Sequence, residues 1–72
     1  MEVSVTINGA VESLGKGSTV LDVLNAKKAR PEMMAVEING ELLRKDDYGV
    51  TALSDGDRME FLPYMAGGGS SS

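Results

Sequence analysis

The sequence contains no cysteine, no histidine and no tryptophan. Without cysteine no disulfide can stabilise the chain, and without cysteine or histidine the usual ligands of zinc and other transition metals are missing. The same absences exclude a catalytic thiol and an imidazole general base. Because so short a chain buries only about 60% of the surface that it exposes when unfolded, one modest apolar core has to hold the fold unaided.

Long apolar runs are missing as well, and positive charge is scarce. No segment approaches the roughly 20 apolar residues of a membrane helix, and the N-terminus lacks the basic and apolar regions of a secretory signal, so we expect a cytoplasmic protein that binds no membrane. Seven basic and eleven acidic residues give a net charge of −4, which repels nucleic acid and favours a partner with a basic docking face. The alternative is that mild acidity serves only to keep a monomer in solution.

The hydrophobic residues, 42% of the chain, follow the periods of strands and a helix. Apolar and polar residues alternate from Glu2 to Ile7, which is typical of a half-buried strand. Asn8-Gly9 tolerates the positive φ angles of a type I′ hairpin turn and predicts a returning strand from Ala10 to Leu14. The same order of strand, turn and strand recurs over Ala35 to Ile38, Asn39-Gly40 and Glu41 to Arg44.

A helix is predicted between the two hairpins. Ser18 or Thr19 can cap its N-terminus, and Asp22 is well placed against the positive end of the helix dipole. We expect the helix to run from Val20 to Ala29 and to be closed by Pro31. Its apolar stripe consists of Val20, Leu21, Val23 and Leu24.

The rest of the chain predicts one further strand and a tail. Lys45 to Leu53 is polar and is interpreted as a connection with one helical turn, and Ser54 to Asp57 is a turn cluster. Arg58 to Leu62 is the expected last strand, and Pro63 argues against a ladder beyond it. Residues 66–72 carry no side chain larger than serine and cannot offset their chain entropy by burial, which predicts a flexible tail.

The order hairpin, helix, hairpin and strand predicts an α+β protein of the β-grasp, or ubiquitin-like, class. In this class a mixed sheet of four to five strands wraps around one main helix, so that the helix stripe and the inner strand residues share a core. The final strand is expected beside the first at the sheet centre. We therefore predict one domain over residues 1–65, followed by the flexible Gly/Ser tail.

Side chains offer little chemistry in this sequence. The densest acidic group is Asp46-Asp47 with Asp55 and Asp57, but its spacing does not match a calcium-binding loop, and solvated turn residues are the simpler interpretation. Gly15-Lys16-Gly17-Ser18 lacks the glycine spacing of a phosphate-binding loop and is interpreted as a turn. We expect no metal site, no bound cofactor and no catalytic residue, so the chain would not be an enzyme.

The C-terminal segment is different, because a chain without a reactive side chain still ends in a carboxylate. Gly67-Gly68 is suited to pass through a narrow channel, since glycine adopts any φ and has no Cβ that would clash with a nucleotide phosphate. Composition alone supports a flexible linker or an appended sequence about as well.

Five short motifs occur in order along the chain. They are Ile7-Asn8-Gly9, Gly17-Ser18-Thr19-Val20, Val36-Glu37-Ile38-Asn39-Gly40, Leu53-Ser54-Asp55-Gly56-Asp57-Arg58-Met59-Glu60 and Met65-Ala66-Gly67-Gly68. No single motif is diagnostic, but the ordered set over residues 1–68 resembles the family of bacterial ubiquitin-like sulfur carriers. The resemblance is strongest to the thiamine-pathway members of this ThiS/MoaD-like family.

The resemblance implies a chemistry for the tail. An ATP-dependent adenylating enzyme would convert the Gly68 carboxylate into an acyl-adenylate, and sulfur would then displace AMP to leave a thiocarboxylate. In thiamine-pathway relatives thiazole synthase accepts the sulfur, and in other relatives a molybdopterin precursor or an amino-acid precursor accepts it. The carrier itself would be a protein co-substrate, and its partner would use the ATP.

Docking to these partners is expected where the chain leaves the sheet. Gly67 and Ala66 would thread the partner's channel. The docking residues would be Leu62, Tyr64, Met65 and Glu60. The alternatives are that Leu62 belongs to the core and that Tyr64 covers a sheet edge.

One feature departs from the family, since its mature members end at Gly-Gly and this chain continues through residues 69–72. Either a processing peptidase removes these residues, or they are an appended sequence that blocks charging, and the mature end is Gly68 or Gly69. Two rival functions remain open. One is a ubiquitin-like modifier joined to lysines, and the other is a non-covalent β-grasp interaction module that would work without residues 67–72.

Overall fold

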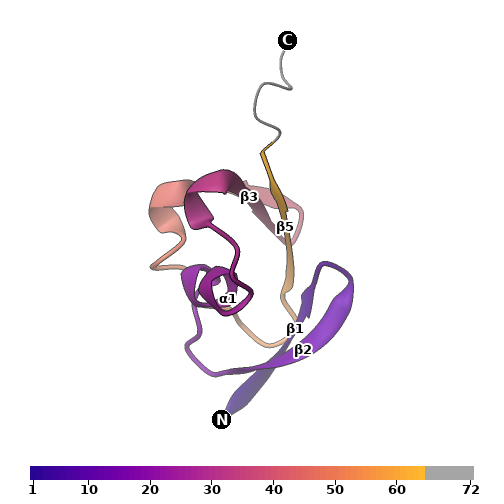
Figure 1. Ribbon diagram of the computed structural model, residues 1–72. Helices are drawn as coiled ribbons and strands as arrows, with labels where there is room; N and C mark the ends of the chain where they lie inside the picture. The colour runs from indigo at the N-terminus through magenta and orange to yellow at the C-terminus, as the bar shows by residue number, and fades with distance from the viewer. Residues whose placement is uncertain (65–72) are drawn as a thin grey trace.

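The computed structural model describes residues 1–64. Five strands, one α-helix and two short 3₁₀ helices follow one another along this part of the chain (Figure 1). In order they are β1 (Glu2–Ile7), β2 (Ala10–Gly15), α1 (Val20–Ala26), η1 (Pro31–Met33), β3 (Met34–Ile38), β4 (Glu41–Leu43), η2 (Lys45–Asp47) and β5 (Arg58–Pro63). The expected order of hairpin, helix, hairpin and strand is confirmed.

The strands form one mixed sheet in the order β2-β1-β5-β3-β4. β5 runs parallel to β1 and antiparallel to β3, so the last strand lies beside the first at the centre, as the sequence predicts. Figure 1 shows the sheet curving around α1, with Met1 and the end of β5 at opposite ends of the molecule. The fold is therefore the predicted β-grasp, with five strands.

Both Asn-Gly pairs form the predicted hairpin turns. Asn8 and Asn39 have φ angles of 50° and 52°, and the glycines after them have 86° and 87°, the positive values that a type I′ turn requires. The asparagine side chains also bind β5. Asn8 Oδ1 accepts a hydrogen bond of 2.9 Å from the Phe61 amide, and Asn39 Oδ1 accepts one of 2.9 Å from the Arg58 amide.

Helix α1 begins as predicted and ends earlier. Thr19 caps it through a capping box, in which the Thr19 hydroxyl accepts from the Asp22 amide and the Asp22 carboxylate accepts from the Thr19 amide. The predicted end at Ala29 is wrong, because Lys28 adopts a φ of 60°. The Ala29 amide then donates to the Leu24 carbonyl at 2.8 Å, which is the closing bond of a Schellman motif. Glycine usually marks that position, so a lysine there gives no sequence signal.

The two prolines also act differently from the prediction. Pro31 does not close α1 but begins η1. Pro63 does not end the pairing of β5, since it lies opposite Met34 and the next amide, that of Tyr64, donates to the Met33 carbonyl at 2.8 Å. A proline lacks a backbone N–H donor, and here the residue after it donates the next hydrogen bond, to the end of η1.

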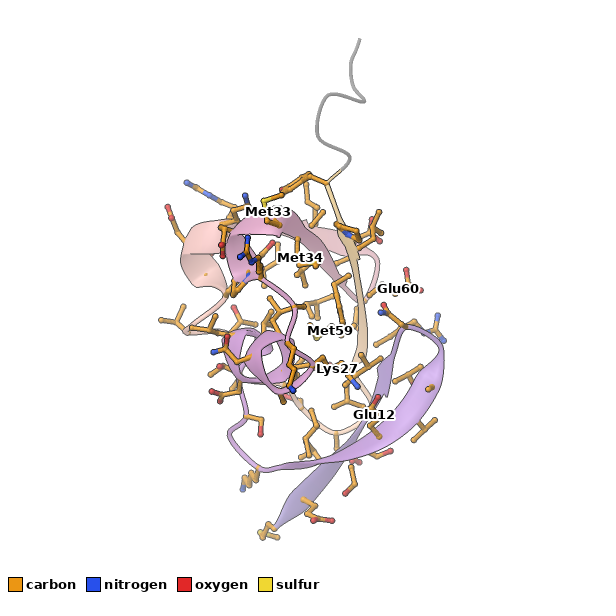
Figure 2. All side chains as sticks on the ribbon, in the orientation of Figure 1. Glu12, Lys27, Met33, Met34, Met59 and Glu60 are labelled. Carbon is orange, nitrogen blue, oxygen red and sulfur yellow. The ribbon has the colours of Figure 1, made fainter. Side chains whose placement is uncertain are left out.

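The core lies between α1 and the concave face of the sheet. Figure 2 shows Met59 of β5 pointing into this space. The buried side chains are Val5, Ile7, Val20, Val23, Leu24, Val36, Tyr48, Leu53 and Met59. Tyr48 and Leu53 belong to the segment that the sequence analysis interprets as a polar connection. No helix within residues 1–64 is long and apolar enough to cross a membrane.

Candidate docking face and tail root

The side of the sheet that faces away from α1 carries a set of exposed side chains. We call this side the outer face and define it by Glu37, Leu42, Arg58, Glu60 and Leu62. Strand alternation explains it, because Met59 points inward and Glu60 points outward from the same strand (Figure 2). Leu62 is 60% exposed and is therefore not a core residue, which leaves the docking interpretation of the sequence analysis open.

Two glutamates of the outer face lie directly opposite each other. Glu37 of β3 pairs with Glu60 of β5, and Leu42 of β4 lies on the other side of Glu37. Like charges in this position repel each other, and neither carboxylate forms an ion pair with another residue of the described range. The outer face therefore presents two unpaired negative charges between exposed leucines, a surface that complements basic and apolar groups of a partner.

A polar hollow of about 410 Å³ lies on the same face, near the start of β5. Its lining residues are Glu37, Asn39, Gly40, Gly56, Arg58 and Glu60. Within residues 1–64 no three potential metal-ligating side chains come together. Two of the aspartates considered for calcium have structural partners, because Asp55 Oδ1 accepts from the Ser4 amide and Asp57 Oδ2 accepts from the Ser54 amide.

Tyr64 is the last residue that the structure describes, and we call this point the tail root. Tyr64 is 49% exposed, and the Lys45 ammonium lies 4.6 Å from the centroid of its ring, within the range of a cation–π contact. The Lys45 Nζ also donates to the Glu32 carbonyl at 2.7 Å. Sequence analysis missed Lys45, because nothing in the sequence shows that η2 lies beside the end of β5.

Tyr48 lies under the tail root. Its side chain is 3% exposed, and its hydroxyl donates to the Met34 carbonyl at 2.8 Å. Burial raises the pKa of Tyr48, and the nearby Tyr64 raises it further. Tyr48 therefore stays neutral and serves as a fixed hydrogen-bond donor.

The expected tail residues Met65, Ala66, Gly67 and Gly68 lie outside the described residues, as does the boundary between domain and tail. Among the predicted docking residues, the structure places Glu60 and Leu62 on the outer face and Tyr64 at the tail root.

A comparison with protein families matches the ThiS family model to residues 4–68. The chain belongs to the ThiS family. The match covers most of β1, the other four strands, α1, and Gly67 and Gly68, which confirms the resemblance seen in the sequence motifs.

Two solved structures are similar to this ThiS-family chain. The crystal structure of the thiamine biosynthesis protein ThiS from Geobacter metallireducens has 35% sequence identity and a TM-score of 0.77, and the match covers 88% of this chain and 96% of that one. An NMR structure of a thiamine biosynthesis protein from the same organism has 35% identity and a TM-score of 0.72, with 88% and 85% covered.

A longer relative is also similar. A thiazole synthase from Paramagnetospirillum magneticum is 31% identical over 64 residues, which are 89% of this chain and 20% of that protein. The ThiS-family chain thus spans about a fifth of the length of this curated relative.

Proposed function

We propose that this chain is a sulfur carrier of thiamine biosynthesis that holds sulfur as a thiocarboxylate on Gly68. The family match carries the proposal, because it extends through the tail and ends at Gly68, the second of the two glycines. The described residues support it from a second direction. They form a folded body with an exposed outer face beside the tail root.

The proposed charging reaction has two steps on a partner enzyme. The Gly68 carboxylate attacks the α-phosphorus of ATP, which forms an acyl-adenylate and releases pyrophosphate. A sulfide-equivalent nucleophile then attacks the acyl carbon and displaces AMP, which leaves sulfur in place of one carboxylate oxygen. Glycine suits both steps, because the missing Cβ lets the backbone approach the nucleotide closely.

Thiazole synthase is the proposed acceptor enzyme. The support is the similarity of this chain to part of a thiazole synthase and to structures of thiamine biosynthesis proteins. A thiocarboxylate has to be protected from hydrolysis until it reacts, and a closed channel in the partner excludes water. The carrier contributes docking and reach, and the partners contribute catalysis.

Residues 69–72 have to be removed before charging, because Gly68 has no free carboxylate while Gly69 is joined to it. A processing peptidase would supply this step if the residues are native, and an appended sequence would block charging. A chain that still carries these residues would be uncharged in either case.

The outer face is the proposed docking surface for the adenylating enzyme. Its repelling pair, Glu37 and Glu60, gains a counter-charge when a basic partner side chain approaches, while Leu42 and Leu62 supply apolar contact. Tyr64 and Met65 would extend this surface toward the tail.

Intact-mass measurement tests the proposal. Chains ending at Gly68, Gly69 and Ser72 are incubated with the adenylating enzyme, ATP and sulfide, and a chain ending at Ala66 serves as the control. We expect only the chain ending at Gly68 to gain the mass difference between sulfur and oxygen. Charging of the chain that ends at Ser72 would contradict the proposal, and charging at Gly69 would move the carrier position by one residue.

A second incubation identifies the acceptor. The charged chain is mixed with thiazole synthase and its other substrates, and loss of the sulfur mass from the carrier is followed together with thiazole formation. Sulfur loss only with a molybdopterin or amino-acid synthase would reassign the pathway. Isopeptide-linked ladders in cell extract would instead indicate a protein modifier.

A further inference from the structure

Three consecutive carbonyl groups at the junction of η1 and β3 each accept a hydrogen bond from a different residue, two of them at η2 and one after β5. The three carbonyls belong to Glu32, Met33 and Met34. Their donors are the Lys45 ammonium at 2.7 Å, the Tyr64 amide at 2.8 Å and the Tyr48 hydroxyl at 2.8 Å. We call this arrangement the carbonyl bracket. It ties η2 and the end of β5 to one short segment, whose methionines are labelled in Figure 2.

The three donors of the carbonyl bracket differ in accessibility. Tyr48 is buried in the core and the Tyr64 donor is a backbone amide, so both hydrogen bonds are integral to the fold. Lys45 is exposed, and its ammonium lies 4.6 Å from the Tyr64 ring centroid. Lys45 therefore contacts the side chain of the tail root from outside the core.

We infer that Lys45 is a positioning residue that sets the direction in which the chain leaves Tyr64 toward a partner enzyme. This inference rests on the proposed function, because the direction matters only if the chain end has to enter an active site. Gly68 follows Tyr64 by four residues, and four extended residues reach at most about 14 Å. The orientation of the tail root therefore decides which region within this reach is open to the carboxylate.

A fixed starting direction lowers the entropy that is lost when the tail enters the partner. Removing the Lys45 ammonium should raise this loss and weaken productive association. The chemical step takes place at Gly68 inside the partner and should keep its rate. The effect should thus appear in the KM for the carrier and not in kcat.

The test uses Lys45→Met in the chain ending at Gly68, since all described contacts lie within residues 1–64. Adenylation by the activating enzyme is followed through AMP release at varied carrier concentration. Lys45→Arg keeps the cation, and Lys16→Met removes the same charge next to the end of β2. From the strength of exposed cation–π contacts, we expect a KM about two- to fivefold higher in Lys45→Met. We expect parental values in both other variants and an unchanged kcat in all three.

A second measurement needs no partner enzyme. In the full-length chain, hydrogen exchange of the Tyr64 amide by NMR should be about two- to fivefold faster in Lys45→Met than in the parent, from the same contact strength. Circular dichroism confirms that each variant is folded at the assay temperature.

The outcomes separate this inference from the proposed function. If the parent chain is charged and Lys45→Met has the parental KM, the positioning role is wrong and the carrier function stands. An equal rise in Lys16→Met, or a fall in kcat alone, also overturns the positioning role. If the parent chain ending at Gly68 is never charged, the proposed function fails and the inference fails with it.

Discussion

Single residues link the β-grasp elements in ways that turn propensity alone does not show. Asn8 and Asn39 adopt the positive φ of a hairpin turn and also hold β5 through their side-chain oxygens. The central strand is thus bound to the turn of each hairpin. The Asn-Gly pairs predict the turns, but a second role for the asparagine side chains follows only from the position of β5.

Replacing Asn8 by glycine separates these two roles. Glycine keeps the positive φ at no steric cost but removes the Oδ1 acceptor of the Phe61 amide. We expect Asn8→Gly to lower the free energy of unfolding by about 1 kcal/mol, measured by urea denaturation. If Asn8→Gly is as stable as the parent, the side-chain bond contributes nothing, and turn conformation alone explains the asparagine.

Tyr48 gives the protein a dependence on alkaline pH. Its pKa is raised above the ordinary value of 10.0, first by burial and then by Tyr64. Between the ordinary pKa of 10.0 and the higher folded-state pKa, the unfolded chain loses the Tyr48 phenolic proton while the folded chain keeps it. The stability contribution is therefore complete below pH 10 and is lost as the pH rises through the folded-state pKa.

We expect the free energy of unfolding of the parent to fall more steeply above pH 10 than that of Tyr48→Phe. At neutral pH the free energy of unfolding of Tyr48→Phe should be about 1 kcal/mol lower than that of the parent, because the Met34 carbonyl loses its donor. Urea denaturation at several pH values measures both effects, and Tyr64→Phe should reduce the pH effect only in part, because burial is the larger cause of the raised pKa of Tyr48. If the free energy of unfolding depends on pH in the same way in the parent and in Tyr48→Phe, ionisation of Tyr48 is not the cause of the alkaline loss of stability.

At the scale of elements, the strands could be predicted and some ends could not. Alternation and Asn-Gly turns are local signals, and they placed β1, β2 and β3 to within one residue. The end of α1 depends on Lys28 adopting a left-handed conformation, which is uncommon for a residue with a Cβ and is not signalled by a lysine in the sequence. Tyr48, the residue after η2, was missed because its segment has no apolar period and its burial depends on contact with β3.

The residues of the outer face could be predicted only in part. Glu60 and Leu62 are expected to be exposed near the tail because they lie close to it in sequence. Glu37 and Leu42 were not, because their place on the same face depends on the register between β3, β4 and β5. No pattern within one strand encodes that register.

The opposed glutamates of β3 and β5 give a prediction in which stability and docking change in opposite directions. Glu60→Gln removes the repulsion with Glu37 and should raise the free energy of unfolding by about 0.2–1 kcal/mol at low salt. High salt should reduce this gain by screening. The same variant should raise the KM in the adenylation assay. Glu41→Gln is the matched control, because Glu41 lies opposite Ile38. A stability loss in Glu60→Gln would show that the pair is not repulsive.

At the scale of the whole molecule, the sheet divides two tasks between its faces. The concave face packs on α1 and forms the hydrophobic core of the described range, whereas the outer face keeps its leucines and glutamates exposed. The centre of the sheet, β5, takes part in both and ends at the tail root. The proposed docking residues of β5 therefore belong to the central strand of the sheet, and the tail root directly follows this strand.

This division predicts opposite results for two leucine-to-alanine changes. Leu24 is fully buried in the core, and Leu24→Ala should cost about 2–5 kcal/mol. Small domains are stable by only about 0.05–0.15 kcal/mol per residue, so this variant should be largely unfolded at moderate urea concentration. Leu42 is 72% exposed, and Leu42→Ala should change the free energy of unfolding by less than about 0.5 kcal/mol while raising the KM for adenylation. If Leu42→Ala is instead charged with the parental KM, the outer face is not the docking surface, and the activating enzyme has to recognise the tail root and tail alone.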